Sequence, residues 1–230
     1  MQIDSSMCLG GRRLVGNYYY FTDKPVITDG EEYYATANHL LEHNTLYAGE
    51  LDRTIDYRLY SKRTLGYPMY LVFQHLNTTT TLISSIGLVL LNFFLGIQLL
   101  SSLRTKKRGY VLFAVFFAVH LPLALHTTFP LSDLMLCTVI STSVLVFYDS
   151  KNTLHSKLIS IGLLWGLGLL LKPVLLPTIL FSPLVYLYFR FNKGKSSIAL
   201  LFPLVVFLVG SGINYTNTGQ YEYSSISTIN

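Results

Sequence analysis

A carboxylate opens the most polar stretch of this chain. Asp29 begins the run Asp-Gly-Glu-Glu-Tyr-Tyr, and Thr28 with Glu31 forms the capping-box pattern of a helix start. The helix dipole favours the ionised form of a carboxyl group in a first turn. An ionised carboxylate at a membrane surface can accept a proton from a hydroxyl. Asp29 is therefore the candidate general base, and the alternative is that it only starts the helix.

Three further charged residues could bind an anion or act as a second acid. Arg63 stands just before the first long uncharged run, and Lys172 interrupts a later run directly before a proline. Positive charge at these places would stabilise a phosphate group. Asp133 is the candidate second acid, which would orient an acceptor or a donor. The alternatives stay open: Lys172 as an interfacial anchor, and Arg63 as a helix-start residue that pairs with Asp56 or lipid headgroups.

A divalent metal is a weaker alternative for three residues near one predicted turn. Imidazole and carboxylate groups suit zinc or manganese, and ionisable groups near a membrane are functional candidates. The spacings of six and seven between His120, His126 and Asp133 match no compact ligand motif. We therefore assign no definite metal or other cofactor.

The composition is that of a membrane protein. Of the 230 residues, 51% are hydrophobic and only 13% are charged, whereas soluble domains carry about a quarter charged residues. A spanning helix needs roughly 20 apolar residues. The charge-free runs predict an all-α, polytopic transmembrane bundle of about six spans; these runs are 64–103, 109–132, 134–148, 158–171, 173–189 and 196–221.

The connections between these runs predict the orientation. The segments 104–108, 151–157 and 190–195 are basic, and basic loops face the cytoplasm. The chain must then cross out and back between the last two, turning near Lys172. This places on the outer face the segments 1–76, 126–132, 172–176 and 214–230. The net charge of +5 arises largely from these loops, so we expect no nucleic-acid partner.

The same pattern divides the chain into an outer polar segment (1–76), a bundle (77–213) and the start of an outer C-terminal segment (214–230). Within the first, residues 29–45 should form an amphipathic helix that lies flat on the membrane. Its apolar face would contain Tyr33, Ala37, Leu40 and Leu41. No spanning helix precedes the outer segment, so we expect the chain to be a fragment of a longer protein.

The outer segment also resembles a known family. An acid, a tyrosine four residues on, an alanine eight on and a double leucine lead to Arg-x-x-Gly-Tyr-Pro at 63–68. This order resembles the first outer loop of GT-C type polyprenyl-phosphate-dependent glycosyltransferases. The similarity is to the branch that includes protein O-mannosyltransferase-like and aminoarabinose transferase-like enzymes.

Three later stretches are also similar to this family. They are the Gly-Leu-rich run ending at Lys172-Pro173, the Leu-Ser-Asp at 131–133, and the Asn-Tyr-x-x-x-Gly at 214–219. Two residues depart from the family, which usually has arginine at the basic-proline pair and often glutamate in place of Asp133. Lysine lacks the planar fork of arginine. The family's first spanning helix and its remaining C-terminal region have no counterpart here.

The resemblance implies a function and roles for the residues. The donor would be a sugar on a polyprenyl phosphate in the bilayer, and the acceptor a hydroxyl of a lipid, glycan or protein. Asp29 would deprotonate that hydroxyl for an inverting transfer on the extracytoplasmic face of the plasma membrane. A small-solute transporter and a non-catalytic membrane partner are the alternatives. A transporter should carry ionisable groups in mid-span, and the predicted spans are almost bare of charge.

Overall fold

The computed structural model describes residues 29–49, 51, 55–60, 62–119, 132–148, 153–193 and 195–224. Over these residues the regular secondary structure is helical, and one isolated antiparallel bridge joins Tyr47 and Tyr60. The predicted all-α class is therefore confirmed for the described part. The helices are α2 (Asp29–His43), α3 (Gly66–Phe73), α4 (Thr78–Ser102), α5 (Lys107–Val119), α7 (Asp133–Tyr148), α8 (Leu154–Leu171), α9 (Pro177–Lys193) and α10 (Phe202–Thr218), with the short 3-10 helices η1 (Tyr57–Leu59), η2 (Pro173–Leu175) and η3 (Lys195–Leu201).

Within the part of the chain that the structure describes, three stretches are long and apolar enough to cross a membrane. They are Thr78–Ser102 with 25 residues, Leu154–Leu171 with 18 and Ile198–Thr218 with 21. Helices α7 and α9 are apolar but shorter, and the structure describes α5 only to Val119. The chain is thus a membrane protein with three candidate spans, and the full set of six stays a prediction.

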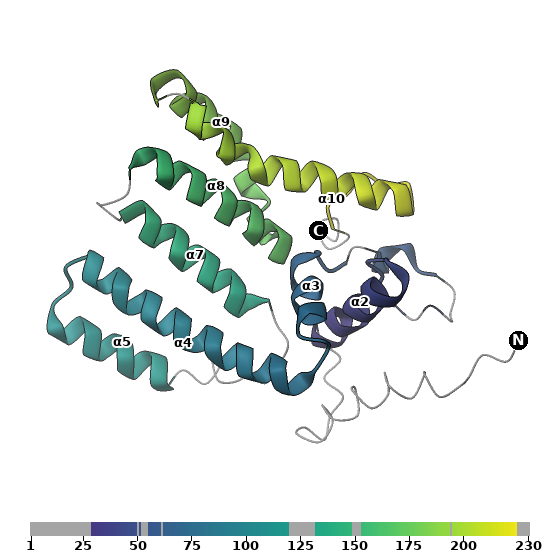
Figure 1. Ribbon diagram of the computed structural model, residues 1–230, viewed down its shortest axis with the longest axis horizontal. Helices are drawn as coiled ribbons and strands as arrows, with labels where there is room; N and C mark the ends of the chain where they lie inside the picture. The colour runs from purple at the N-terminus through teal and green to yellow at the C-terminus, as the bar shows by residue number, and fades with distance from the viewer. Residues whose placement is uncertain are drawn as a thin grey trace, which may run out of the picture.

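The bundle helices lie side by side in a row. Figure 1 shows the spatial order α5, α4, α7, α8 and then the crossing pair α9 and α10. Helices α4 and α7 are neighbours although α5 comes between them in the chain. The Asn92 amide of α4 donates to Leu134 O at 3.1 Å and to Thr138 Oγ1 at 2.9 Å, which ties α4 to α7. Such interhelical hydrogen bonds are a common means of association in membranes.

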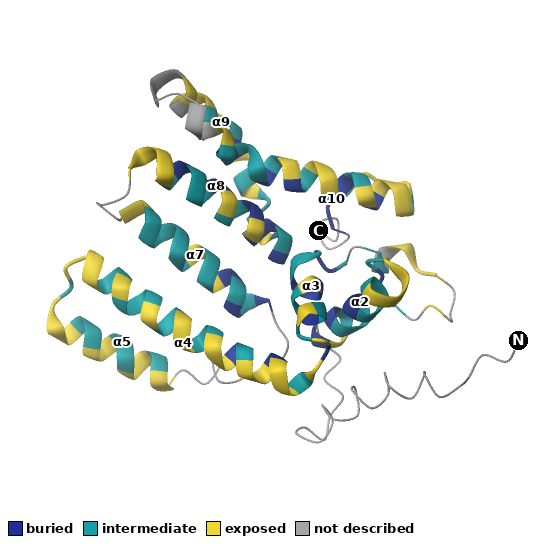
Figure 2. Cartoon of the chain, in the orientation of Figure 1, coloured by how far each residue is buried: buried dark blue, intermediate teal, exposed yellow. Residues whose placement is uncertain are grey.

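Small residues let the middle of the bundle pack closely. A Cβ at Gly162 would lie 2.1 Å from Ala199 O, and one at Gly166 would lie 2.1 Å from the Phe202 ring. Glycine is needed at both positions because α8 approaches η3 and the start of α10 this closely. Figure 2 shows buried positions along α8 and on α2 and α3, whereas α5 has none in its described length.

The first uncharged run is divided in two. The chain leaves α3 after Phe73, and His75 and Leu76 adopt the left-handed conformation with φ of 54° and 53°. The Asn77 side chain then caps α4 by accepting from the N–H groups of Thr79 and Thr80. The run 64–103 therefore contributes a short helix, a sharp turn and one span, and α4 begins where the predicted bundle does.

Candidate functional site at the polar end of the bundle

Four segments that are distant in the sequence meet at one end of the bundle. The Tyr33 hydroxyl lies 2.9 Å from Ser132 Oγ. The Thr64 hydroxyl donates to Leu171 O at 2.8 Å, and the Ser224 hydroxyl donates to Lys62 O at 3.2 Å. Figure 1 shows α2, α3, the start of α7 and the ends of α8 and α10 together at this end. We call it the polar end, and it collects the described parts of all four segments predicted to be outside.

Helix α2 begins at the residue predicted to open it. Asp29 is its first residue, but the Asp29 side chain lies outside the part that the structure describes. Tyr33 follows one turn later, and residues four apart share a helix face. The backbone thus places the candidate base one turn before the tyrosine that contacts Ser132.

The buried face of α2 packs on α3 and differs from the predicted face. Tyr33 and Ala37 are buried as predicted, and the Tyr33 ring meets the Tyr67 ring edge-on at 4.7 Å. Thr36 is fully buried and Leu41 is 59% exposed, so Leu41 does not pack on α3, and the predicted position of α2 flat on the membrane stays a prediction. The face that meets α3 is centred on positions i, i+3 and i+4 from Tyr33, and Leu41 falls past its edge.

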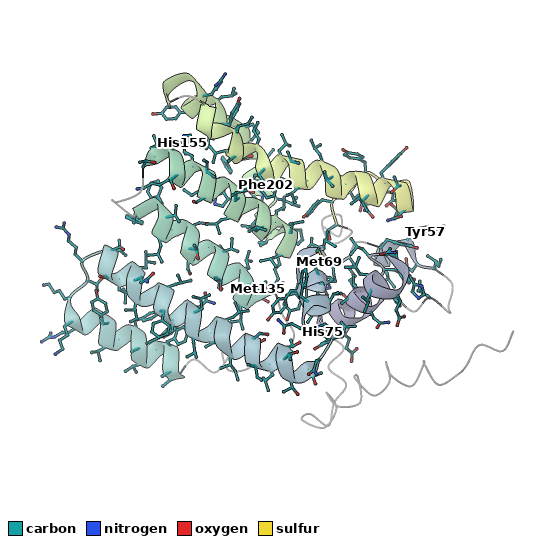
Figure 3. The ribbon with its side chains drawn as sticks, viewed as in Figure 1. Tyr57, Met69, His75, Met135, His155 and Phe202 are labelled. Carbon is teal, nitrogen blue, oxygen red and sulfur yellow. The ribbon has the colours of Figure 1, made fainter. Side chains whose placement is uncertain are left out.

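Helix α7 also contacts this core. Met135 packs against the cluster formed by α2 and α3, and Figure 3 labels it at the start of α7. The Tyr34 hydroxyl donates to Thr81 Oγ1 at 3.4 Å, and the Tyr70 hydroxyl donates to Ser84 Oγ at 2.5 Å. The short helices are therefore fastened to α4 and α7, and they form a fixed cap on the bundle.

Arg63 lies in the interior of the polar end. It is 7% exposed, and its Nε and Nη2 atoms lie 2.8 Å and 2.6 Å from Glu32 Oε2. Its guanidinium carbon sits 5.0 Å from the centroid of the Tyr33 ring. Lys62 Nζ lies 2.5 Å from the other oxygen of Glu32. Glu32 thus binds two cations and holds α2 against the segment that precedes α3.

Two of the candidate site residues form an ion pair with each other. Lys172 Nζ donates to Asp133 Oδ1 at 2.6 Å, and the two side chains are 25% and 35% exposed. Asp133 is the first residue of α7 and Lys172 caps the C-terminal end of α8. The helix dipoles favour an anion at the first position and a cation at the second. Lysine carries three N–H donors, so the ammonium group retains capacity for a further acceptor.

Short contacts join the candidate residues into one cluster. Arg63 lies over Tyr33, Tyr33 contacts Ser132, and Ser132 precedes the Asp133–Lys172 pair. We call this set the polar cluster: Glu32, Tyr33, Lys62, Arg63, Ser132, Asp133 and Lys172. Of the predicted site residues it contains three, namely Arg63, Asp133 and Lys172. Sequence reasoning missed Glu32, because it lies 31 residues from Arg63 and no local pattern pairs the two.

The chain after α10 folds back to this cluster. Gly219, at φ 74°, ends α10 and reverses the chain. The Tyr223 ring stacks on Phe207 with centroids 5.8 Å apart, and its hydroxyl donates to Leu169 O at 2.9 Å. Burial raises the pKa of the Tyr223 phenol, so it stays a donor. A Cβ at Gly210 would lie 2.6 Å from this ring, so the groove that seats Tyr223 requires glycine there.

The metal alternative stays a prediction, because the structure does not describe two of its three residues. His120 and His126 lie outside the described residues. Among the residues that are described, no group of three His, Cys, Asp or Glu side chains could hold a metal ion. Asp133, the third member of the proposed trio, is engaged by Lys172 instead.

The polar cluster places the partly exposed ammonium group of Lys172 beside the carboxylate of Asp133. The cluster also includes residues of α2, the helix that begins at Asp29. Comparisons of the chain with known protein families, with curated proteins and with solved structures found no match. A function must therefore be argued from this cluster and from the motifs themselves.

Proposed function

We propose that the protein is a membrane glycosyltransferase that moves a sugar from a polyprenyl phosphate to an acceptor hydroxyl. The reaction would invert the anomeric centre on the extracytoplasmic face of the plasma membrane. One observation carries the proposal: the Lys172–Asp133 pair is connected through Ser132 and Tyr33 to the helix that Asp29 opens. The candidate base and the candidate phosphate-binding cation are far apart in the sequence, and the segments that carry them meet at one end of the bundle, which supports the proposal.

In this proposal the two charged groups have separate roles. Asp29 removes the proton of the acceptor hydroxyl, whose oxygen attacks the anomeric carbon as the bond to the phosphate oxygen breaks. The departing phosphate gains negative charge, which a nearby ammonium group stabilises. Lys172 is suited to this because its side chain is 25% exposed. Its ammonium group donates one hydrogen bond to Asp133 and has further N–H groups for a phosphate oxygen. Asp133 then orients Lys172.

Arg63 has a different role here from the one that the sequence suggested. Its side chain is 8% exposed and is bonded to Glu32, so a donor phosphate would have to displace that carboxylate. We assign it the task of positioning: together with Glu32 it holds α2, and hence the backbone of Asp29, against α3. Lys172 becomes the principal phosphate-binding candidate.

The test is sugar transfer by the full-length protein in membranes, with a panel of polyprenyl-phosphate-linked hexoses and pentoses as donors. Asp29→Asn should lower the rate about 10²–10⁴-fold, because a positioned general base contributes that much. Glu31→Gln is the matched control, since Glu31 is exposed on the same helix and loses the same charge. Its rate should be unchanged.

Lys172→Ala should fail in a different way. Loss of the phosphate contact should raise KM for the donor more than it lowers kcat, so excess donor should restore part of the rate. Equal rates for wild type and Asp29→Asn would remove Asp29 from the mechanism. Absence of transfer from every donor would favour a transporter or a non-catalytic partner.

A further inference from the structure

The end of the bundle away from the polar end carries a different charge cluster. Four cations occur within five residues of the turn between α4 and α5, which we call the basic turn: Arg104, Lys106, Lys107 and Arg108. All four are exposed. Among the described residues none of them forms an ion pair with an acid. Figure 1 shows this turn at the same end of the bundle as the end of α7 and the start of α8, and Figure 3 labels His155 at the start of α8.

The backbone holds an arginine where glycine is usual. Thr105 N donates to Leu100 O and Arg104 N to Ser101 O, each at 3.0 Å, which is the Schellman arrangement at a helix end. Arg104 occupies the left-handed position with φ 51°. Long side chains are uncommon there, and glycine adopts it without strain. The turn therefore keeps a cation at a position where the backbone alone would favour glycine.

The next two cations are also placed against local preference. Lys107 and Arg108 begin α5, whose first turn contains no acid. The N-terminal end of a helix carries partial positive charge, so cations there are unfavourable and an anion is favourable. An anion bound at the basic turn would relieve this repulsion. The four cations of the basic turn therefore favour a ligand that carries negative charge.

The surface beside these cations is apolar and would suit an apolar part of the ligand. A hollow of about 550 Å³ is lined by Lys107, Arg108, Val111 and Leu112. Val111 and Leu112 are 55% and 70% exposed, and both lie on the helix just below the two cations. The hollow is open and shallow, and a ligand with negative charge at one end and an apolar chain at the other would match both the cations and this apolar surface.

We propose that the basic turn binds an anionic phospholipid. Its phosphate would be held by Lys107, Arg108 and Arg104, and an acyl chain would run along Val111 and Leu112. Clusters of Lys and Arg next to a membrane helix attract anionic lipids, and the hollow here adds a seat for the chain. This site is separate from the polar cluster and does not depend on the proposed transferase activity.

The test is lipid binding by the full chain in mixed micelles, with phosphatidylglycerol against phosphatidylcholine at equal mole fraction, read as thermal stabilisation over a lipid titration. Phosphatidylglycerol should stabilise the wild type at lower lipid. Lys107→Gln/Arg108→Gln should weaken its affinity about 25-fold, since each cation contributes roughly fivefold. Lys157→Gln/Arg190→Gln is the matched control, because it removes the same charge from the start of α8 and the end of α9. It should change the affinity less than about twofold, because neither residue lines the hollow.

A second variant separates lipid binding from folding. Arg104→Gly should weaken the phosphatidylglycerol affinity about fivefold while the lipid-free protein is as stable as wild type or more so. If the Lys107→Gln/Arg108→Gln variant does not fold, Arg104→Gly alone tests the proposal. Equal losses in both double variants, equal stabilisation by phosphatidylcholine, or unchanged affinity in Arg104→Gly would overturn the proposal. Inorganic phosphate that protects as well as the lipid would overturn the assignment to a phospholipid.

Discussion

The two ends of this bundle carry charge in opposite ways. At the polar end, Lys62, Arg63 and Lys172 each have a carboxylate oxygen within 2.5–2.6 Å. At the basic turn, the four exposed cations have no acidic partner among the described residues. The first end therefore uses its charges to fasten segments together, although the Lys62 and Lys172 side chains, at 26% and 25% exposed, stay partly accessible. The second leaves its charges available to a ligand from outside the chain.

The largest effect should come from removing the acid that binds two cations. Glu32→Gln leaves Arg63, which is 7% exposed, with a neutral partner. Breaking a largely buried charge pair costs about 3 kcal/mol, and we expect that loss in the free energy of unfolding, measured by denaturant titration in detergent micelles.

Two controls sharpen this prediction. Glu31→Gln removes an exposed acid from the same helix, and Lys106→Gln removes an exposed cation from the basic turn. Both should stay within about 0.5 kcal/mol of wild type, as surface substitutions do. A loss for Lys106→Gln as large as that for Glu32→Gln would mean that the two ends do not differ in the way described.

A smaller effect should follow from one hydroxyl at the polar end. Tyr33→Phe removes the hydrogen bond to Ser132, which is fully buried. Leaving a buried hydroxyl without that partner should cost about 1.5 kcal/mol in the free energy of unfolding. Tyr57→Phe, at a position that is 62% exposed, is the control and should be neutral. If the two variants unfold alike, the contact between α2 and the start of α7 does not fasten the cap.

The helical elements were predictable because their signals are local. The apolar runs, the capping pattern before α2 and the proline after Lys172 each depend on neighbouring residues. The break at His75 and Leu76 was missed because an uncharged run carries no signal of a left-handed turn. Periodicity placed Leu41 on the same face as Tyr33 and Ala37, but it could not show how much of that face α3 covers, and Leu41 is 59% exposed.

The polar cluster was predictable only in part. Charge type and topology were enough to select Arg63, Asp133 and Lys172 as residues of one end. The sequence could not show that Arg63 faces Glu32, because the two are 31 residues apart and no helical spacing links them. It also could not show that Lys172 bonds to Asp133, which lies on a different helix. Which charged residues pair across two elements depends on tertiary packing. The periodicity of residues within one element gives no information about such pairs.

The most direct measurement asks whether the two ends face opposite sides of the membrane. Single cysteines at His43, exposed at the end of α2, and at Lys106, exposed in the basic turn, would be introduced after Cys8→Ser and Cys137→Ser. A membrane-impermeant thiol reagent is then applied to intact cells. We expect labelling at position 43 before permeabilisation and at position 106 only afterwards. Labelling of both positions from the same side would contradict the separation of the polar end from the basic turn.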